Sequence, residues 1–253
     1  MERIHEECGV FGVYASEVQN LASMAYYGLY ALQHRGQDSC GIVVNDGGVF
    51  SVHKDLGLVG DVFSKEELAK LGNGKIAVGH VRAGVKGSNT VDNVQPLVVN
   101  HVKGTLAIAY NGSLINKGEL RTGLELEGSI FHSTGATEVI AYEIIKERLK
   151  APSIEHAVVN AMNNLKGAYC IVVMSPTKLI AARDPLGFRP LCYGKTEDGS
   201  YVVASESCAL DAVGAKLEPR AISPLVPTSM SRTGFSSLCI PTASRSAVIS
   251  PPT

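Results

Sequence analysis

Residues 5–12 read HEECGVFG and place one cysteine, Cys8, at the start of a short, glycine-bounded apolar run. The run continues to residue 15 as CGVFGVYA, whose β-branched and aromatic side chains are typical of a strand. Removal of residues 1–7 would give Cys8 a free α-amine, with an ordinary pKa of about 8, that can accept the proton of its own thiol. The stretch indicates a strand that begins with a nucleophile; a buried strand cysteine without chemistry is the plainer alternative.

Further runs of strand character follow along the chain, separated by turn signals. They cover residues 41–46, 49–54, 75–81, 106–112, 168–174, 178–183 and 201–207. An Asp-Gly-Gly break at residues 46–48 predicts a hairpin within residues 39–55. Helix-period stretches lie at 18–33, 64–71, 116–126, 136–150 and 154–165. Strand clusters alternate with helix pairs, so the pattern predicts an α+β fold of mainly antiparallel sheets covered by helices.

The last 37 residues, 217–253, differ in composition from the rest of the chain. They contain six of the eleven prolines and eight serines, and no helical or alternating pattern long enough to predict an element. Such a segment buries too little apolar surface to offset its ordering entropy. We expect the folded domain to end near residues 214–216 and the tail to be disordered.

Composition limits the partners. The 253 residues are 45% hydrophobic and 19% charged, with a formal net charge of −1, which implies no basic face for a nucleic-acid backbone or an anionic membrane. The first twelve residues carry acids where a secretory signal carries bases, and no apolar stretch reaches 18 residues. We expect a cytoplasmic protein that acts on a small molecule or binds another protein.

The six cysteines are widely spaced and contain no Cys-x-x-Cys pair. No cysteine and histidine cluster at zinc-finger spacing either, so we expect free thiols, no metal site and no cofactor. Apart from Cys8, the cysteines are expected to be small core residues.

Several motifs, taken in order, resemble one known family. HEECGVFG is followed by QHRGQDSCGI at 33–42, GHVRAG at 79–84, NVQPL at 93–97, YNGSL at 110–114, ARDPLGFRPL at 182–191 and VVASESCALDAVGA at 202–215. Together they resemble the glutaminase domain of the amidophosphoribosyltransferases, a class II glutamine amidotransferase with an N-terminal nucleophile. The resemblance covers residues 6–216. It implies a four-layer αββα sandwich, a leader at 1–7 that is lost autocatalytically, and an amidotransferase domain at 8–216.

The resemblance also implies a reaction and its residues. Cys8 attacks the side-chain amide of glutamine, giving a thioester and free ammonia. Asn111 and Gly112 match an oxyanion hole, in which an amide group and a backbone N–H meet the developing negative charge. A turn is the alternative for these two residues, since Asn-Gly is a common hairpin turn.

Three further residues, Arg82, Arg35 and Gly36, match parts of the family site. Arg82 matches the arginine that binds the α-carboxylate of the substrate, a task that suits the planar guanidinium; a solvated surface arginine is the alternative. Arg35 and Gly36 match a loop beside the nucleophile, where a structural role at a helix end is the alternative. His34 is expected to be a packed or capping residue rather than a base.

Three departures fall on the expected glutamine pocket. Ala83 and Val85 stand where the family has tyrosine and threonine, and Ala136 stands where it has the aspartate that binds the ammonium group of glutamine. Loss of one partner of a desolvated charge pair costs about 2–5 kcal/mol. Glutamine binding is therefore expected to be weak unless Glu138 or another acid substitutes.

The resemblance ends before the phosphoribosyltransferase domain of the family, whose phosphate loop is not found after residue 217. The expected function is release of ammonia from glutamine for phosphoribosylamine synthesis in de novo purine biosynthesis, with the synthase half absent. A catalytically silent glutaminase-like module that binds or regulates is the alternative, as is an amidase for another amide. The protein partner left open is a second copy of this chain or a separate phosphoribosyltransferase domain.

Overall fold

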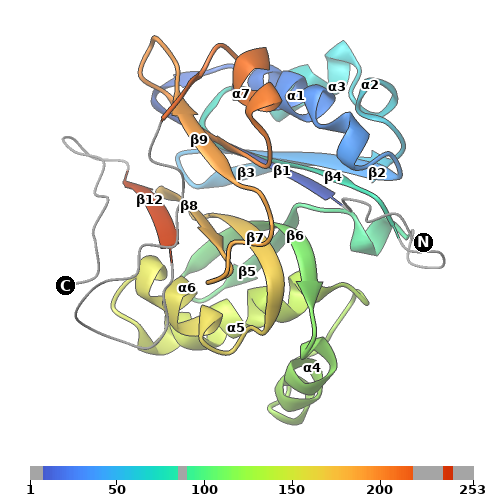
Figure 1. Cartoon of the computed structure of the whole chain (residues 1–253), viewed down its shortest axis with the longest axis vertical. Helices are drawn as coiled ribbons and strands as arrows, with labels where there is room; N and C mark the ends of the chain where they lie inside the picture. Colours follow the sequence, from blue (N-terminus) through green and yellow to red (C-terminus); the bar gives the residue numbers. More distant parts are fainter. Residues whose placement is uncertain (1–7, 85–89, 219–235, 242–253) are drawn as a thin grey trace.

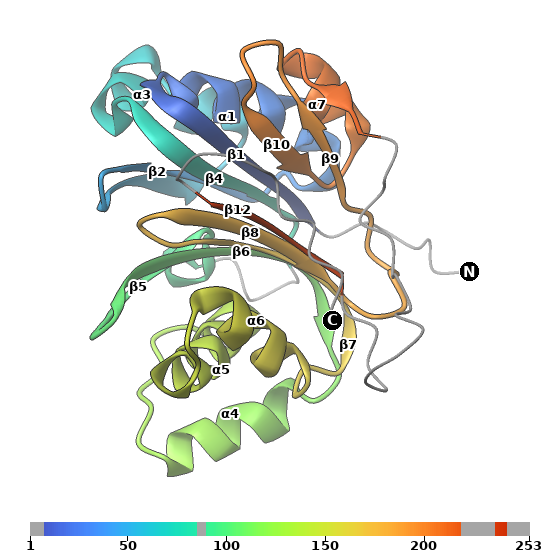
Figure 2. The same cartoon turned by 90° about the vertical axis from the view of Figure 1, so that its left-hand side faces the viewer.

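The computed structural model of the chain describes residues 8–84, 90–218 and the backbone of 236–241. Val85 and the leader at 1–7 lie outside these residues, as does most of the tail. The described chain folds into two sheets that pack face to face with helices on both outer sides, which Figure 2 shows as four layers. The predicted four-layer αββα sandwich is confirmed.

The first sheet has seven strands in the order β11-β9-β10-β1-β4-β2-β3. Their bounds are β1 Cys8–Gln19, β2 Ser39–Asp46, β3 Val49–Leu56, β4 Gly74–Arg82, β9 Cys192–Lys195, β10 Tyr201–Ala204 and β11 Lys216–Leu217. The second sheet has five strands in the order β12-β8-β7-β6-β5. Their bounds are β5 Leu97–His101, β6 Gly104–Leu114, β7 Gly167–Met174, β8 Lys178–Arg183 and β12 Ser236–Pro241. Neighbouring strands of the described residues pair antiparallel throughout.

Helices cover each sheet on the side away from the other sheet (Figure 1). Their bounds are α1 Leu21–Ala31, α2 Val59–Val62, α3 Lys65–Leu71, α4 Lys117–Leu126, α5 Ala136–Lys150, α6 Ile154–Met162 and α7 Ser207–Ala212, with short 3-10 turns η1 Gln33–Arg35 and η2 Val91–Asn93. Apolar residues of α1 and α7 pack on β1, β2 and β4, and those of α5 and α6 pack on β6, β7 and β8. A third apolar cluster fills the space between the sheets.

Local signals explain several element boundaries. The Asn20 side chain accepts a hydrogen bond from the Ser23 N–H at 3.0 Å and starts α1. The hairpin between β2 and β3 turns at Gly47 and Gly48, whose φ angles of 57° and 97° favour glycine, and the Asn45 side chain accepts from the Gly48 N–H at 2.9 Å. The predicted hairpin is confirmed.

Several elements differ from the sequence expectations. Strands β5, β9 and β11 and helices α2 and α7 were not predicted. The predicted strand 201–207 ends at Ala204, and α7 begins at Ser207. In the tail, Ser236–Pro241 forms β12 at the edge of the second sheet, paired with β8 from Lys178 to Arg183. The sequence pattern did not predict this pairing, because an open strand edge offers backbone partners even to a segment with little apolar surface.

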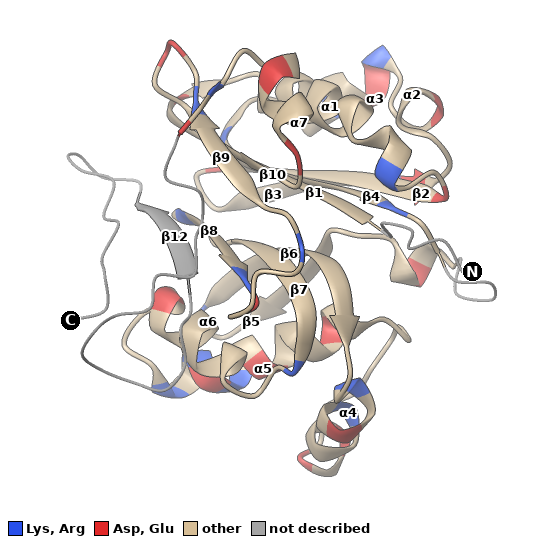
Figure 3. Cartoon of the chain, viewed as in Figure 1, with Lys and Arg blue, Asp and Glu red and all other residues tan. Residues whose placement is uncertain are grey.

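Charged residues of both signs are interspersed along the described chain. In the view of Figure 3, neither the basic nor the acidic colour dominates a layer, in keeping with the net charge of −1. Within the described residues, no helix combines the length and apolar character that crossing a bilayer requires.

Candidate active site

Three strands of the first sheet bring polar residues together at one end. Cys8, the first residue of β1, pairs with Arg82, the last residue of β4, and Arg82 pairs on its other side with Ser39, the first residue of β2. Paired residues project from the same face of a sheet. Val10, two residues after Cys8, belongs to the apolar cluster between the sheets. By the period of two along a strand, Cys8, Arg82 and Ser39 face the second sheet at the rim of that cluster.

The second sheet supplies a matching row. Asn111 of β6 pairs with Cys170 of β7, which pairs with Arg183 of β8. Cys170 belongs to the cluster between the sheets, so this row faces the first sheet. The two rows meet at the same end, because the His80 ring Nε2 lies 2.9 Å from the carbonyl oxygen of Tyr110, the residue before Asn111. The structure thus brings together the thiol, the arginine and the amide that the sequence analysis singled out.

His80, which links the two sheets, is held in its neutral form. The ring is fully buried, and burial lowers its pKa to about 3, although the hydrogen bond to Tyr110 acts in the opposite direction. At neutral pH the ring is therefore neutral, and it donates from Nε2 because its partner is a carbonyl oxygen. Its Nδ1 has no hydrogen-bond partner in the described part of the chain. His80 is thus a structural link and not a base for the thiol.

Asn111 and Gly112 lie inside β6, which excludes the hairpin-turn alternative. The Asn111 side chain is fully buried, and neither its Oδ1 nor its Nδ2 has a hydrogen-bond partner among the described residues. A buried amide left unpaired costs about 1–3 kcal/mol, so the side chain is arranged for a partner that the described residues do not provide. Gly112 has φ +149°, and a Cβ there would overlap the carbonyl oxygen of Ala168. Glycine is the residue that this position requires.

The segment after α1 braces both Cys8 and Arg82. The Arg35 side chain is buried, and its Nε donates to the carbonyl oxygen of Cys8 at 2.9 Å. Gly36 packs directly against the main chain of Arg82, where an added Cβ would lie 2.5 Å from the carbonyl carbon. The Asp38 N–H donates to the Arg82 carbonyl oxygen at 2.9 Å, and the Asp38 carboxylate accepts from the Gly84 N–H at 2.6 Å. Structural roles for Arg35 and Gly36 are therefore visible in the packing.

Charged groups act on the second cysteine of the site. Burial raises the pKa of the Cys170 thiol to about 12, while the guanidinium groups of Arg35, Arg189 and Arg183 act in the opposite direction and the Cys8 thiol raises it further. Of these guanidinium groups, that of Arg35 is paired with the Glu206 carboxylate.

A family model described as the glutamine amidotransferase domain matches residues 80–212, more than half of the chain. The chain belongs to this family. The matched range contains Arg82 and the buried Asn111, both at the site described above. Cys8 lies before the matched range but in register with Arg82.

Curated proteins match this chain over most of its length. The amidophosphoribosyltransferase of Methanocaldococcus jannaschii is 46% identical over 209 residues, which are 83% of this chain and 44% of the relative. That of Bacillus subtilis is 45% identical over 213 residues, 84% of this chain and 44% of the relative. This chain spans less than half the length of these curated relatives.

Solved structures resemble the amidotransferase domain as well. Glutamine phosphoribosylpyrophosphate amidotransferase from B. subtilis, complexed with ADP and GMP, superposes with a TM-score of 0.76 at 43% identity, over 83% of this chain and 44% of that one. A predicted glutamine amidotransferase from Pseudomonas aeruginosa PA01 matches with a TM-score of 0.50 at 13% identity, over 93% and 98% of the two chains, and shares the fold alone.

The N-terminus of α5 carries Ala136 and Glu138, which the sequence analysis assigned to the expected glutamine pocket. Ala136 begins α5 and packs against the apolar cluster of the second sheet. The buried Glu138 carboxylate accepts hydrogen bonds from the N–H of His132 at 3.0 Å, from the N–H and hydroxyl of Ser133 at 2.7 Å each, and from the Tyr142 hydroxyl at 3.3 Å. Burial opposes ionisation, but these hydrogen bonds outweigh it and lower the pKa of Glu138. Glu138 thus holds the loop before α5, which favours a structural role over binding an ammonium group.

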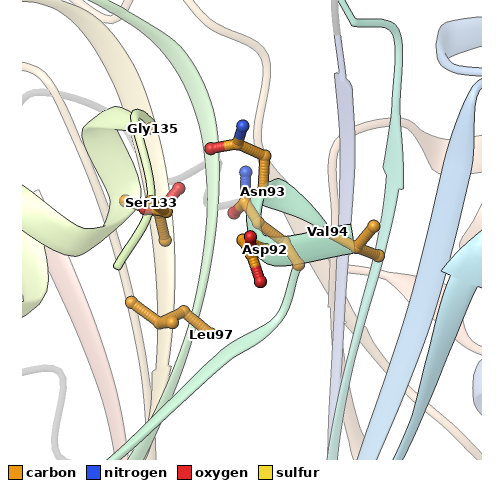
Figure 4. Close-up of a pocket in the computed structure, with 8 residues that line it drawn as sticks. Asp92, Asn93, Val94, Leu97, Ser133 and Gly135 are labelled. Atoms are coloured by element: carbon orange, nitrogen blue, oxygen red, sulfur yellow. The ribbon is translucent and has the colours of Figure 1, made fainter. Parts of the chain in front are cut away.

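A small pocket adjoins this loop. Figure 4 shows Asp92 and Asn93 of η2 on one side and Ser133 and Gly135 on the other. Asn93 fastens the two sides together, because its Oδ1 accepts from the Thr134 N–H at 3.2 Å. Its Nδ2 donates to the Thr134 hydroxyl at 3.1 Å. These bonds hold η2 beside the loop that leads into α5.

Sequence reasoning missed two residues of the site. Glu206 binds the Arg35 guanidinium, and Ser205 bonds to the main chain of β1. Both belong to the quoted motif VVASESCALDAVGA, which carried the resemblance without a role for either residue. In the described residues, no group of three or more His, Cys, Asp and Glu side chains is arranged to hold a metal ion.

Proposed function

We propose that the chain is a glutaminase in which Cys8 attacks the side-chain amide of glutamine. The observation that supports this most is the meeting of three groups at one rim of the sandwich. They are Cys8, Arg82 and the Asn111 amide, which has no hydrogen-bond partner among the described residues. These are a nucleophile, a cation for a carboxylate and a buried amide for an oxyanion.

The proposed reaction starts after residues 1–7 are removed. The α-amine of Cys8 takes the thiol proton, and the sulfur forms a bond to the amide carbon of glutamine. The Asn111 Nδ2 and the Gly112 N–H donate to the tetrahedral oxyanion. The amide nitrogen accepts the proton from the Cys8 amine and leaves as ammonia. Water then cleaves the thioester to glutamate and restores the thiol, so that no oxidant or reductant is needed.

The proposed use of the ammonia is synthesis of phosphoribosylamine in de novo purine biosynthesis. The relatives that the chain matches are amidophosphoribosyltransferases, and 44% of their length is covered. The acceptor reaction is assigned to the part of these relatives that the match does not cover.

A second candidate function is a silent glutaminase-like module. It is favoured by Ala136, which has no polar side-chain atom, and by the commitment of Glu138 to its own loop. An inactive module would keep the fold and still bind a partner.

One experiment separates the two functions. Intact mass spectrometry measures whether residues 1–7 are lost, and 6-diazo-5-oxonorleucine, a glutamine-like electrophile, is then added while ammonia release from glutamine is followed. Loss of the leader, a label on Cys8 and ammonia release support the glutaminase. An intact leader with an unlabelled Cys8 supports the silent module.

A further inference from the structure

Two successive polar contacts connect Glu206, the residue before α7, to Cys8 through Arg35. The Arg35 guanidinium donates from Nε to the Cys8 carbonyl oxygen at 2.9 Å and from Nη1 to the carboxylate of Glu206. The Arg35 side chain is 2% exposed, whereas Glu206 is 34% exposed. Glu206 thus reaches from the surface to a buried cation that touches the nucleophile residue.

The position of Glu206 is fixed by its neighbour. The Ser205 hydroxyl accepts from the Val10 N–H at 3.0 Å, and the Ser205 N–H donates to the Val10 carbonyl oxygen at 3.0 Å. Val10 lies two residues after Cys8 in β1. Residues 205 and 206 therefore hold both the main chain of the nucleophile strand and the arginine that binds its first carbonyl group.

The carboxylate of Glu206 is itself held on both oxygens. Oε1 binds Arg35, while Oε2 lies 3.1 Å from the His34 ring Nε2 and 3.8 Å from the Cys208 sulfur. A buried guanidinium needs both a counter-charge and hydrogen-bond acceptors, and a carboxylate provides both. With its carboxylate fixed at two points, Glu206 leaves the guanidinium little freedom to rotate.

We propose that Glu206 is a positioning residue for the Cys8 nucleophile, acting through the Arg35 guanidinium on the Cys8 carbonyl group. Fixing that carbonyl fixes rotation about the bond between the α-carbon and the carbonyl carbon of Cys8. The α-amine and the thiol are thereby held in one orientation toward Asn111. The inference rests on the proposed function, because it concerns the reactivity of Cys8.

A double-mutant cycle in the full chain tests whether Glu206 acts through Arg35. The variants are Glu206→Gln, Arg35→Met and the double variant, and kcat and KM for ammonia release from glutamine are measured for each. Glu206→Gln is expected to lower kcat about 10- to 100-fold with little change in KM, since small misplacements of a reacting group have effects of that size. In the Arg35→Met background, Glu206→Gln is expected to change kcat by less than about twofold.

Two matched variants control for general effects. Glu155 forms a comparable half-buried pair with Lys178, so Glu155→Gln removes an ion pair away from Cys8. His34→Ala removes the second contact of Glu206 and leaves Arg35 in place, so it is expected to lower kcat less than Glu206→Gln does. Glu155→Gln is expected to keep the kcat of the parent chain within about twofold, whereas Glu206→Asp is expected to recover part of what Glu206→Gln loses.

The rate of Cys8 alkylation by iodoacetamide, followed at the Cys8 peptide, makes the result independent of turnover. Failure of the parent chain to release ammonia overturns the proposed function, and the alkylation rates of the four chains in the cycle still decide the inference. The positioning role is overturned if the rate losses of Glu206→Gln and Arg35→Met multiply in the double variant. It is also overturned if Glu206→Gln and Glu155→Gln lower the rate equally.

Discussion

The region around Cys8 (the thiol side) and the N-terminus of α5 (the α5 side) carry very different side chains. On the thiol side, Cys8 and Arg82 are paired in register and Arg35 binds the Cys8 carbonyl oxygen. The Asn111 amide there has no hydrogen-bond partner within the described part of the chain. On the α5 side, Ala136 is apolar and the nearby Glu138 is occupied by its own loop. The two sides are carried by separate elements, so one side can change while the other keeps its geometry.

The strongest test of the thiol side is removal of the nucleophile. Cys8→Ala is expected to lower ammonia release from glutamine by about a thousandfold or more, because no other group forms the thioester. Cys40→Ala is the matched control, since Cys40 is fully buried and burial raises its thiol pKa to about 12. Ammonia release in Cys8→Ala equal to that of the control would contradict the assignment.

The next test separates chemistry from stability at Asn111. Asn111→Ala is expected to lower kcat about 100- to 1000-fold with little change in KM, the usual effect of losing one oxyanion donor. The free energy of unfolding should change by less than about 1 kcal/mol, since the lost packing is offset by removal of an unpaired buried amide. Steady-state kinetics and urea unfolding measure the two quantities. A loss of stability above about 2 kcal/mol with unchanged kcat would make Asn111 a structural residue.

A third test restores charge on the α5 side. Ala136→Asp is expected to lower the KM for glutamine roughly thirtyfold or more, if one partner of a desolvated charge pair is worth 2–5 kcal/mol. The KM for glutaramate, which lacks the ammonium group, should not fall. Ala136→Asn, of the same size but uncharged, is the control. An equal gain for both substrates, or for both variants, would show that position 136 does not meet the ammonium group.

The smallest effect concerns the link between the sheets. The pKa of His80 falls from 6.5 in the unfolded chain to about 3 in the fold, so the unfolded state binds one more proton between these pH values. The stabilisation from neutral His80 is complete above pH 6.5 and declines as the pH falls toward 3, by up to about 1.4 kcal/mol per pH unit. Urea unfolding from pH 6 to pH 4 should show a shallower loss of stability in His80→Gln. Parallel curves for the two chains would show that His80 does not titrate in this range.

The central strands were predicted well because they are regular, whereas the four layers were inferred from the family resemblance. The run from Cys8 and the run 168–174 are apolar enough to be buried on both faces, and the Asp-Gly-Gly break marks the hairpin. Strands β5 and β9 were missed because they are short and partly exposed, so their pairing partners decide their conformation.

The candidate site residues were inferred from the ordered motifs of the resemblance and not from local patterns. Asn-Gly in YNGSL is locally a turn signal, and only its place in β6 beside β7 shows otherwise. Glu206 and Arg35 are 171 positions apart, and no periodic pattern connects them. Contacts of this kind depend on the tertiary packing of α7 against the first sheet, which a local sequence window does not contain.

The nucleophile and the amide of the candidate site belong to different sheets, joined near the site by the contact between His80 and Tyr110. Their separation is therefore set by the thickness of the apolar filling between β1 and β6. Because packed interiors resist compression and respond to the gain or loss of a single methylene, enlarging or trimming a side chain such as Val10 or Ala109 would alter the reach of the thiol without touching any polar group. The distance between Cys8 and Asn111 thus depends on apolar packing between the sheets as well as on the polar residues at the rim.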